Sequence, residues 1–270
     1  MNTSMRPKAG RALSQLLLAC WLLAAGRVAA APGLSLEEGI ARDPKGGVEL
    51  YREQHFLRSE GERPLERLVL YRCPGGVLFG RKRIDYRSSA LAPSFLLDDR
   101  RSGYQEGMRA VRSGAELFFR ARAGAAERSA PVALAALVAD AGFDQFIRRQ
   151  WSPLLAGKSL PLQFAVPSRL RSMGFLVARA GSARIAGEPA WVFRLRLEGW
   201  LGLVAPSIEV SYSQASRRLL RFQGLGNLRD DRGGQPLQVR IDFPSAAHPA
   251  TEAQWQAALQ APLAVCRTGQ

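Results

Sequence analysis

Short runs of alternating apolar and polar residues are the sequence feature that most constrains the fold of this chain. The runs recur between residues 48 and 243, and the segments that join them are short and rich in glycine, proline, serine and aspartate. Alternation with a period of two predicts a β-strand with one buried face. Connections this short require neighbouring strands to be antiparallel. We therefore expect a mainly β fold of the α+β type, a single curved antiparallel sheet or half-open barrel of about ten strands.

The predicted strands come from both halves of the chain. They cover residues 47–58, 65–73, 77–87, 104–112, 115–123, 160–166, 174–180, 190–198, 208–213, 217–223 and 237–243. Residues 132–139 are apolar, and they form either a buried strand or the beginning of a helix. No linker or repeat of fixed length divides this part of the sequence, so residues 48–243 are expected to form one domain.

One segment in the middle of the chain, residues 140–156, has the periodicity of a helix instead. Its large apolar side chains are spaced by three and four residues, and they are Phe143, Phe146, Ile147, Trp151 and Leu154. This spacing places them on one face of a helix. Asp140 is expected to cap the helix N-terminus, and Ser152-Pro153 to begin a second short turn. Because so apolar a face needs a partner, we expect this helix to plug the concave face of the sheet.

The first 30 residues have the pattern of a signal peptide. Basic residues precede an apolar run over residues 12–26, and Val28-Ala29-Ala30 supplies the small residues that a signal peptidase requires. We expect cleavage near Ala30 and a periplasmic protein. A lipoprotein anchored through Cys20 is a weaker alternative, because the apolar run continues beyond the cysteine. An uncleaved anchor is weaker still, because a membrane-spanning helix needs about 20 apolar residues.

Two further segments flank the predicted β domain. Residues 31–47 are small, polar and glycine-bearing, so we expect them to form a flexible leader. Residues 244–270 are expected to form a tail with a short helix, at whose beginning Thr251 and Gln254 make a capping box.

Cysteine usage is consistent with export. If Cys20 is removed with the signal peptide, the chain keeps Cys73 and Cys266. In an oxidising compartment these two either form a disulfide, which would tie the end of a strand to the C-terminal tail, or remain two buried thiols.

The formal net charge of +15 allows an anionic partner. Nearly all of the 38 basic residues are arginines, and they are scattered along the chain without a long basic block. Such a profile is typical of codon bias in a GC-rich genome, so we do not expect nucleic acid as a partner.

Arginine pairs spaced by two residues are the candidate anion-binding residues, and they are Arg81 with Arg83 and Arg194 with Arg196. This spacing places both members of a pair on one face of a strand. If the strands are neighbours, the arginines form a basic surface that could hold phosphate or carboxylate and dock an anionic envelope surface or partner. The alternative is a solvated outer face.

Patterns typical of catalytic and metal sites are missing from the sequence. His55 and His248 are the only histidines, and no Cys-x-x-Cys, Gly-x-Ser-x-Gly or phosphate-binding glycine loop occurs. The paired carboxylates Asp98-Asp99 and Asp230-Asp231 are each followed by arginine and a nearby glycine, which is typical of hairpin turns. We therefore expect no catalytic residues, metal or cofactor.

The order of these elements resembles the periplasmic lipoprotein carriers LolA and LolB, and also a set of uncharacterised proteobacterial periplasmic proteins. The export signal, the antiparallel strands and the helical insertion carry the resemblance, together with residues 140–146, Trp151 and residues 164–170. It covers residues 48–243 as topology more than as motif.

The resemblance implies a half-open barrel that holds a hydrophobic or lipid-like ligand, such as an acyl chain, between sheet and helix. The residues expected there are Phe143, Phe146, Ile147, Trp151 and Phe164. These side chains either belong to the core alone or also line a ligand cavity. The expected function is that of a non-enzymatic binding or carrier protein, and docking to an anionic surface or partner is the alternative.

Overall fold

In the computed structural model of the 270-residue chain, the described residues are 1–3, 33–199, 206–231 and 233–267. Residues 31–270 form one unit and residues 1–30 another. The predicted signal peptide, including Cys20 and the cleavage site near Ala30, lies outside the described residues. Within the described ranges, no helix is long and apolar enough to cross a membrane.

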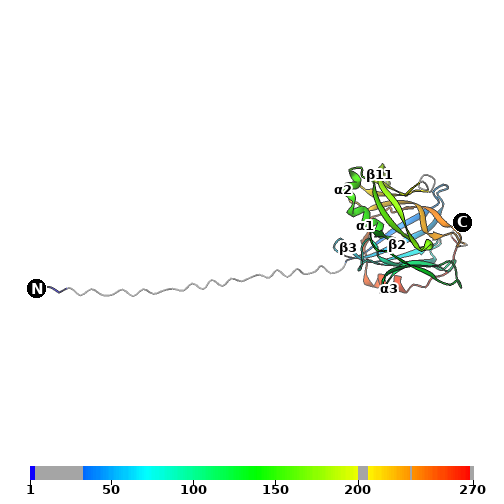
Figure 1. Ribbon diagram of the computed structural model, residues 1–270, viewed down its shortest axis with the longest axis horizontal. Coiled ribbons are helices and arrows are strands. Elements are labelled where there is room, and N and C mark those ends of the chain that lie inside the picture. The colour runs from blue at the N-terminus through cyan, green and yellow to red at the C-terminus, as the bar shows by residue number, and fades with distance from the viewer. Residues whose placement is uncertain (4–32, 200–205, 232, 268–270) are drawn as a thin grey trace. The chain divides into compact units, whose positions relative to one another are not determined.

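Sixteen strands among the described residues form one sheet (Figure 1). The first half of the chain supplies β1 (Gly33–Arg42), β2 (Glu49–Glu60), β3 (Arg63–Arg72), β4 (Leu78–Asp85), β5 (Ser94–Asp99), β6 (Tyr104–Val111), β7 (Gly114–Arg120) and β8 (Arg128–Val132). The second half supplies β9 (Leu137–Val138), β10 (Leu160–Val166), β11 (Arg171–Ile185), β12 (Glu188–Leu197), β13 (Ile208–Ser213), β14 (Leu219–Arg229), β15 (Pro236–Asp242) and β16 (His248–Pro249). The helices are α1 (Gly142–Arg149), α2 (Trp151–Leu155) and α3 (Glu252–Gln260), with a 3-10 turn, η1 (Pro167–Arg169).

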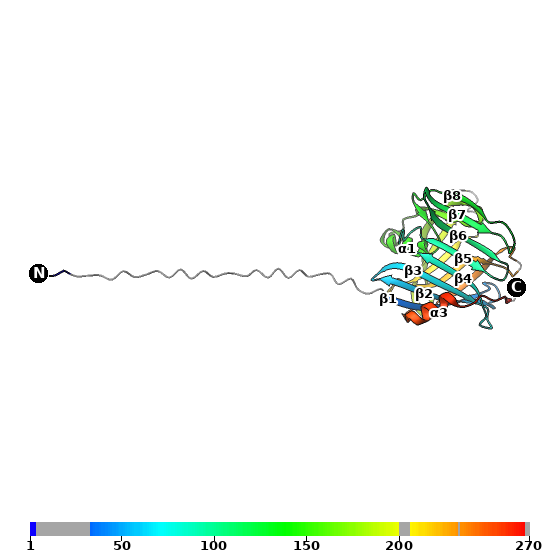
Figure 2. The same ribbon diagram turned by 90° about the horizontal axis from the view of Figure 1, so that it is seen from below.

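The order of strands along the sheet is β8-β7-β6-β5-β4-β3-β2-β1-β15-β14-β13-β12-β11-β10-β9, and β16 pairs with β1. Strand β1 joins the two halves, because it pairs with β2 on one side and with β15 on the other. Figure 2 shows β1 to β8 side by side in this order. The pairs are antiparallel except β9 with β10. The sheet bends, so that side chains of β2 to β5 and of β12 to β15 line one cavity, and we call the face toward this cavity the inner face.

The number of strands exceeds the prediction of about ten, although the prediction of a mainly β, antiparallel fold is confirmed. Strands β9 and β16 have two residues each, which is too short for alternation to be visible. Strand β8 contains Pro131 and is largely exposed at the end of the sheet, so it lacks a buried face that a pattern could reveal.

The flexible leader predicted for residues 31–47 is wrong, because β1 lies in the middle of the sheet. Its small residues are required by close packing on the inner face. A Cβ atom at Gly39 would lie 2.8 Å from Phe243 Cε1 and 3.1 Å from Ile241 Cγ2. On the outer face, Leu36 is buried in a cluster with Trp255 of α3. The absence of large side chains at Gly39 therefore reflects a crowded strand and not a loose segment.

The predicted mid-chain helix is present and is divided in two as expected, but it begins later, and its second part begins at Trp151 instead of Ser152. Ala141 is the N-cap residue of α1 and makes no side-chain capping bond, so the prediction that Asp140 caps the helix is wrong. Asp140 has a φ of 44°. Its carboxylate instead accepts a hydrogen bond from Lys82 Nζ on β4, at 2.9 Å. Gln150 separates α1 from α2.

The apolar face of α1 and α2 packs against the inner face of β10 to β14. Ile147, Trp151 and Leu154 are buried in one cluster with strand residues that include Phe193 and Tyr212. The Trp151 ring centroid lies 5.4 Å from that of Phe193 and 6.0 Å from that of Tyr212. Edge-to-face aromatic contacts at these distances stabilise the packing of the two helices against the sheet.

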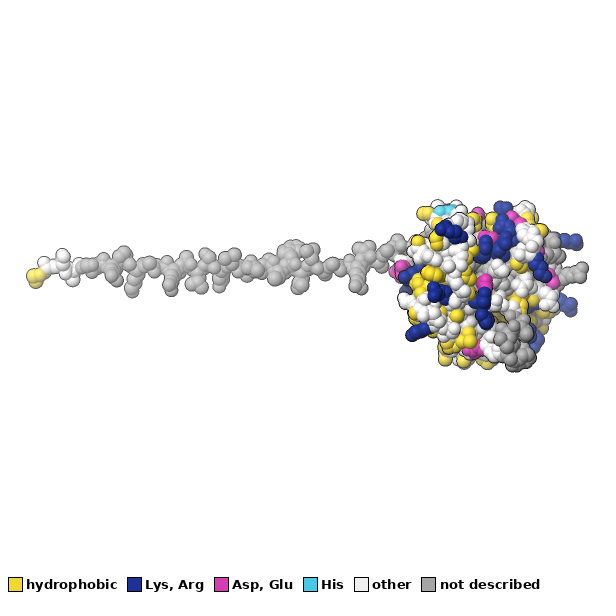
Figure 3. Space-filling view, turned by 90° about the horizontal axis from the view of Figure 1, so that it is seen from above, with side chains coloured by type: hydrophobic (Ala, Val, Ile, Leu, Met, Phe, Trp, Pro, Cys, Tyr) yellow, Lys and Arg dark blue, Asp and Glu magenta, His cyan; other side chains and the backbone are white. Residues whose placement is uncertain are grey.

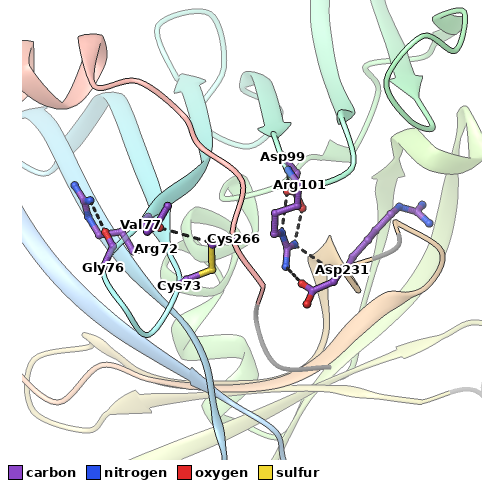
Figure 4. Close-up of a disulfide and its surroundings, with 9 residues drawn as sticks. Arg72, Cys73, Gly76, Val77, Asp99, Arg101, Asp231 and Cys266 are labelled. Carbon is purple, nitrogen blue, oxygen red and sulfur yellow. Dashed lines mark hydrogen bonds and ion pairs between the residues drawn. A yellow bond between two sulfur atoms is a disulfide. The ribbon is translucent and has the colours of Figure 1, made fainter.

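The C-terminal segment covers part of the outer face. Thr251 and Gln254 form the predicted capping box at the beginning of α3. Trp255 of this helix is buried beside Phe56 of β2, with ring centroids 6.4 Å apart. Beyond the helix, a disulfide joins Cys266 to Cys73 at the end of β3 (Figure 4). The tail is thus covalently attached to the sheet.

Candidate functional site

A cavity of about 220 Å³ lies between the two halves of the bent sheet. One side of its lining, which we call the apolar wall, consists of Phe143, Phe164, Leu195, Ile208, Val210, Leu219, Phe222, Ile241 and Phe243. An apolar cavity of roughly 150 Å³ is enough to admit benzene. The cavity is therefore large enough for part or all of a small organic ligand.

The predicted ligand-binding residues divide into two groups. Phe143 and Phe164 line the cavity, and their ring centroids are 6.3 Å apart. Phe146, Ile147 and Trp151 do not line it and belong to the packed cluster between helix and sheet. The helical stripe therefore serves mainly as core, and only its N-terminal aromatic residue reaches the cavity.

Strand register brings charged residues together on the inner face of the first half of the sheet. Residues paired in succession from β1 to β6 form one row across the sheet, and they are Glu37, His55, Val69, Lys82, Leu97 and Glu106. Residues directly opposite each other in neighbouring strands share a face, so all of these side chains are directed inward. Glu37, Lys82 and Glu106 are not among the site residues predicted from the sequence.

A polar network connects the two halves of the sheet at this row. Asp140 Oδ2 accepts hydrogen bonds from Lys82 Nζ at 2.9 Å and from Asn227 Nδ2 at 3.1 Å. Asn227 of β14 also donates to Glu106 Oε1 at 3.3 Å, and the Tyr104 hydroxyl donates to Glu106 Oε2 at 2.7 Å. Burial raises the pKa of Glu106, and the bond from Tyr104 only partly opposes this shift.

Arg67 of β3 is the charged residue of the cavity that lacks a bonded partner in the described part of the chain. Its Nε is buried without a hydrogen-bond partner. Burial favours a lower pKa for Arg67, but electrostatic interactions led by Tyr86 and Asp144 outweigh it and raise the pKa, so the guanidinium stays charged. The Tyr86 hydroxyl and Asp144 Oδ1 are also buried without hydrogen-bond partners.

The predicted arginine pairs do not form a common surface. Arg81 and Arg83 lie on the outer face of β4, and Arg194 and Arg196 lie on the outer face of β12. In the sheet, β4 and β12 are separated by β3, β2, β1, β15, β14 and β13. Arg81 donates to the carbonyl oxygen of Ala261, and Arg194 donates to Glu209 Oε1 at 2.7 Å.

Figure 3 shows basic side chains dispersed over one face of the molecule, between hydrophobic and acidic ones. Arg81 and Arg194, two of the four predicted arginines, already donate hydrogen bonds to other groups of the protein. Anion binding by either pair alone stays a prediction.

Asp98 and Asp99 are the last two residues of β5, Asp230 and Asp231 follow β14, and one arginine connects the two pairs. Arg101, in the turn between β5 and β6, donates to Asp99 Oδ2 at 2.6 Å and to Asp231 Oδ1 at 3.0 Å (Figure 4). The side chains of Arg101 and Asp99 are both about 1% exposed. His55 Nε2 lies 2.6 Å from Glu53 Oε2. Within the described ranges, no group of three or more His, Cys, Asp or Glu residues is arranged to hold a metal ion.

Comparisons with known proteins identify no family for this chain. No family model matches the chain, and no curated protein matches it. Among solved structures, the chain is similar to a beta-barrel-like protein of the domain of unknown function DUF1849 from Brucella abortus, with 7% sequence identity and a TM-score of 0.44 over 78% of this chain and 98% of that chain. This similarity does not single out the LolA and LolB carriers, and at this TM-score it carries no functional argument.

Proposed function

We propose that this protein is an exported, non-enzymatic binding or carrier protein for a hydrophobic or lipid-like ligand. The observation that carries the proposal is the cavity of about 220 Å³ with its apolar wall. Protein interiors are normally packed as densely as organic crystals. An apolar ligand in such a cavity gains the dispersion contacts that the lining residues otherwise lack, and it removes its own apolar surface from water.

The arrangement of charged groups around the cavity favours binding over catalysis. Lys82 and Asp140 are bonded to each other, and Asp144 is bonded to Arg148 at 3.0 Å. Side chains held in such pairs stabilise the lining and leave the apolar wall as the main contact surface for a ligand.

Export to the periplasm is part of the proposal and rests on the signal-peptide pattern of residues 1–30. The disulfide between Cys73 and Cys266 is compatible with an oxidising compartment. A periplasmic carrier would shield acyl chains from water between the two membranes of the envelope.

Mass spectrometry of lipid extracted from natively purified protein tests the proposal. We expect lipid to co-purify with the wild-type protein and to be lost from Leu219→Trp, because Leu219 belongs to the apolar wall and the larger side chain would occupy the cavity. Leu176→Trp is the matched control, because Leu176 is 41% exposed on β11. The absence of lipid from the wild type, or equal lipid in all three proteins, would refute the proposal.

A further inference from the structure

We propose that the ligand of this cavity carries a negatively charged head group that binds the guanidinium of Arg67. The inference rests on the proposed function, because it names the chemical class of the ligand. That class is an amphiphile whose tail contacts the apolar wall and whose head is an oxyanion, either a carboxylate or a phosphate.

The position of Arg67 directs it toward the ligand. Arg67 lines the cavity from the inner face of β3. It is paired in register with Leu57 of β2 and Ile84 of β4, and Ile84 is buried among apolar side chains. Its Nε is buried without a partner, and no hydrogen bond or ion pair among the described residues involves its guanidinium.

The other charged side chains that line the cavity each have a bonded neighbour. The pairs are Lys82 Nζ with Asp140 Oδ2 at 2.9 Å, Arg148 Nε with Asp144 Oδ2 at 3.0 Å, and His55 Nε2 with Glu53 Oε2 at 2.6 Å. Among the described residues, Arg67 is the charged side chain of the lining that has no such bonded neighbour. A ligand oxyanion would supply the bonded counter-charge that this side chain lacks.

Carboxylates near Arg67 do not replace such a ligand. Asp144 and Glu37 interact with it electrostatically, but neither forms a hydrogen bond with it. Asp144 is bonded to Arg148, and Glu37 is 3.5 Å from Arg218 Nη1. Each carboxylate is thus held by another arginine, and this reduces its repulsion of an incoming anion.

The chemistry of the guanidinium selects the head group. A charged group removed from water is costly unless it is paired and hydrogen-bonded. The planar guanidinium presents its N–H groups in a fork that fits carboxylate and phosphate oxygens in a bidentate manner. An uncharged head group would leave the guanidinium of Arg67 without a hydrogen-bonded counter-charge, and a cationic head group would add repulsion.

Binding of four dodecyl probes to delipidated protein tests the inference. The probes are dodecanoate, dodecyl phosphate, dodecanol and dodecyltrimethylammonium, measured by calorimetry below the concentrations at which they form micelles. We expect the wild type to bind at least one of the two anionic probes about tenfold or more tightly than dodecanol, and the ammonium probe most weakly. The difference between dodecanoate and dodecyl phosphate identifies which oxyanion the site prefers.

Two variants assign the preference to Arg67. Arg67→Met should bind the anionic probes and dodecanol with similar affinity, and Arg67→Lys should keep part of the preference because it keeps the charge without the fork. Arg83→Met is the matched control, because Arg83 is exposed on the outer face of the neighbouring strand β4, and it should bind like the wild type. If Arg67→Met does not fold, the probe preference of the wild type together with Arg67→Lys decides the outcome.

The possible results separate this inference from the proposed function. If dodecanol binds the wild type as tightly as both anionic probes, or if Arg67→Met keeps the preference, the inference is overturned while ligand binding in the cavity stands. If none of the four probes binds, the proposed function fails, and the inference fails with it.

Discussion

Lys82 Nζ lies 2.9 Å from Asp140 Oδ2, so a strand from the first half of the sheet is bonded directly to the segment that leads into α1. The two side chains are 11% and 2% exposed. Asn227 of β14 bonds to the same carboxylate oxygen, and the contact therefore connects three parts of the chain that are distant in sequence. This network fixes where the helices begin, and with them one end of the cavity.

Replacement of Lys82 measures how much the ion pair between Lys82 and Asp140 contributes to the free energy of unfolding. Lys82→Met leaves Asp140 buried without its cation, and the loss of one partner of a buried ion pair typically costs about 3–5 kcal/mol. Urea denaturation should show a loss of this size, and part of it should be recovered when Asp140→Asn removes the uncompensated charge in the double variant. Arg83→Met, on the exposed face of the same strand, should change the free energy of unfolding by less than about 0.5 kcal/mol. Equal effects of the two methionine variants would contradict this role of the pair.

The alternation of residues predicts most strands of the sheet, but not the site within it. Lys82 shares a strand face with the buried Ile84, and Arg67 shares one with the buried Val69, so charged side chains on an apolar face were visible in the sequence. Alternation within a strand does not determine which residue of the next strand lies opposite. The row from Glu37 to Glu106 depends on that register, and so could not be predicted.

Local signals failed where a distant partner competes with them. Asp140 has the residue type and position of an N-cap, but its carboxylate bonds to Lys82 and Asn227 instead. The segment around Gly39 has the composition of a loose leader, but it forms β1. The side chain of Phe243 leaves no room for a Cβ atom at Gly39. The capping box of Thr251 and Gln254 was predictable because both partners belong to one turn of the chain.

Removal of the disulfide should destabilise the whole unit. Cys73 and Cys266 are 193 residues apart, and a cross-link that closes so long a loop restricts the unfolded chain strongly. We expect Cys73→Ala/Cys266→Ala to lose about 2–5 kcal/mol in urea denaturation. Reduction of the wild-type protein should lower its stability to that of the double variant, whereas the double variant itself should not respond to reductant. Unchanged stability after reduction would show that the tail is held mainly by the contacts of α3.

Two aromatic residues of the helical segment should differ in their roles. Trp151 is 5% exposed in the core, so Trp151→Ala should cost about 3–5 kcal/mol of stability. Phe143 is only partly buried and lines the cavity, so Phe143→Ala should cost less stability but weaken the binding of an acyl probe severalfold. Thermal unfolding and probe titration of both variants measure the two effects separately. If Phe143→Ala binds the probe like the wild type, the helix does not contribute to the ligand site.

The pH dependence of stability should reveal the buried carboxyl of Glu106. Because burial raises its pKa above the ordinary value of 4.5 for a glutamate, the protonated form is favoured in the folded state. Ionised Glu106 therefore lowers stability at neutral pH, and this cost disappears as the pH falls through the raised pKa toward 4.5. We expect the wild type to gain stability relative to Glu106→Gln as the pH decreases over that range.

Glu116 provides the control with the opposite sign. A hydrogen bond from Ser129 lowers the pKa of this half-buried carboxyl most, and a hydrogen bond from Arg109 lowers it further. Its contribution to stability is therefore present above the ordinary glutamate pKa of 4.5 and is lost as the pH falls through the lowered pKa. Relative to Glu116→Gln, the wild type should lose a small amount of stability in acid. Urea denaturation of the three proteins at several pH values measures both trends, and trends of the same sign would show that burial does not dominate the titration of Glu106.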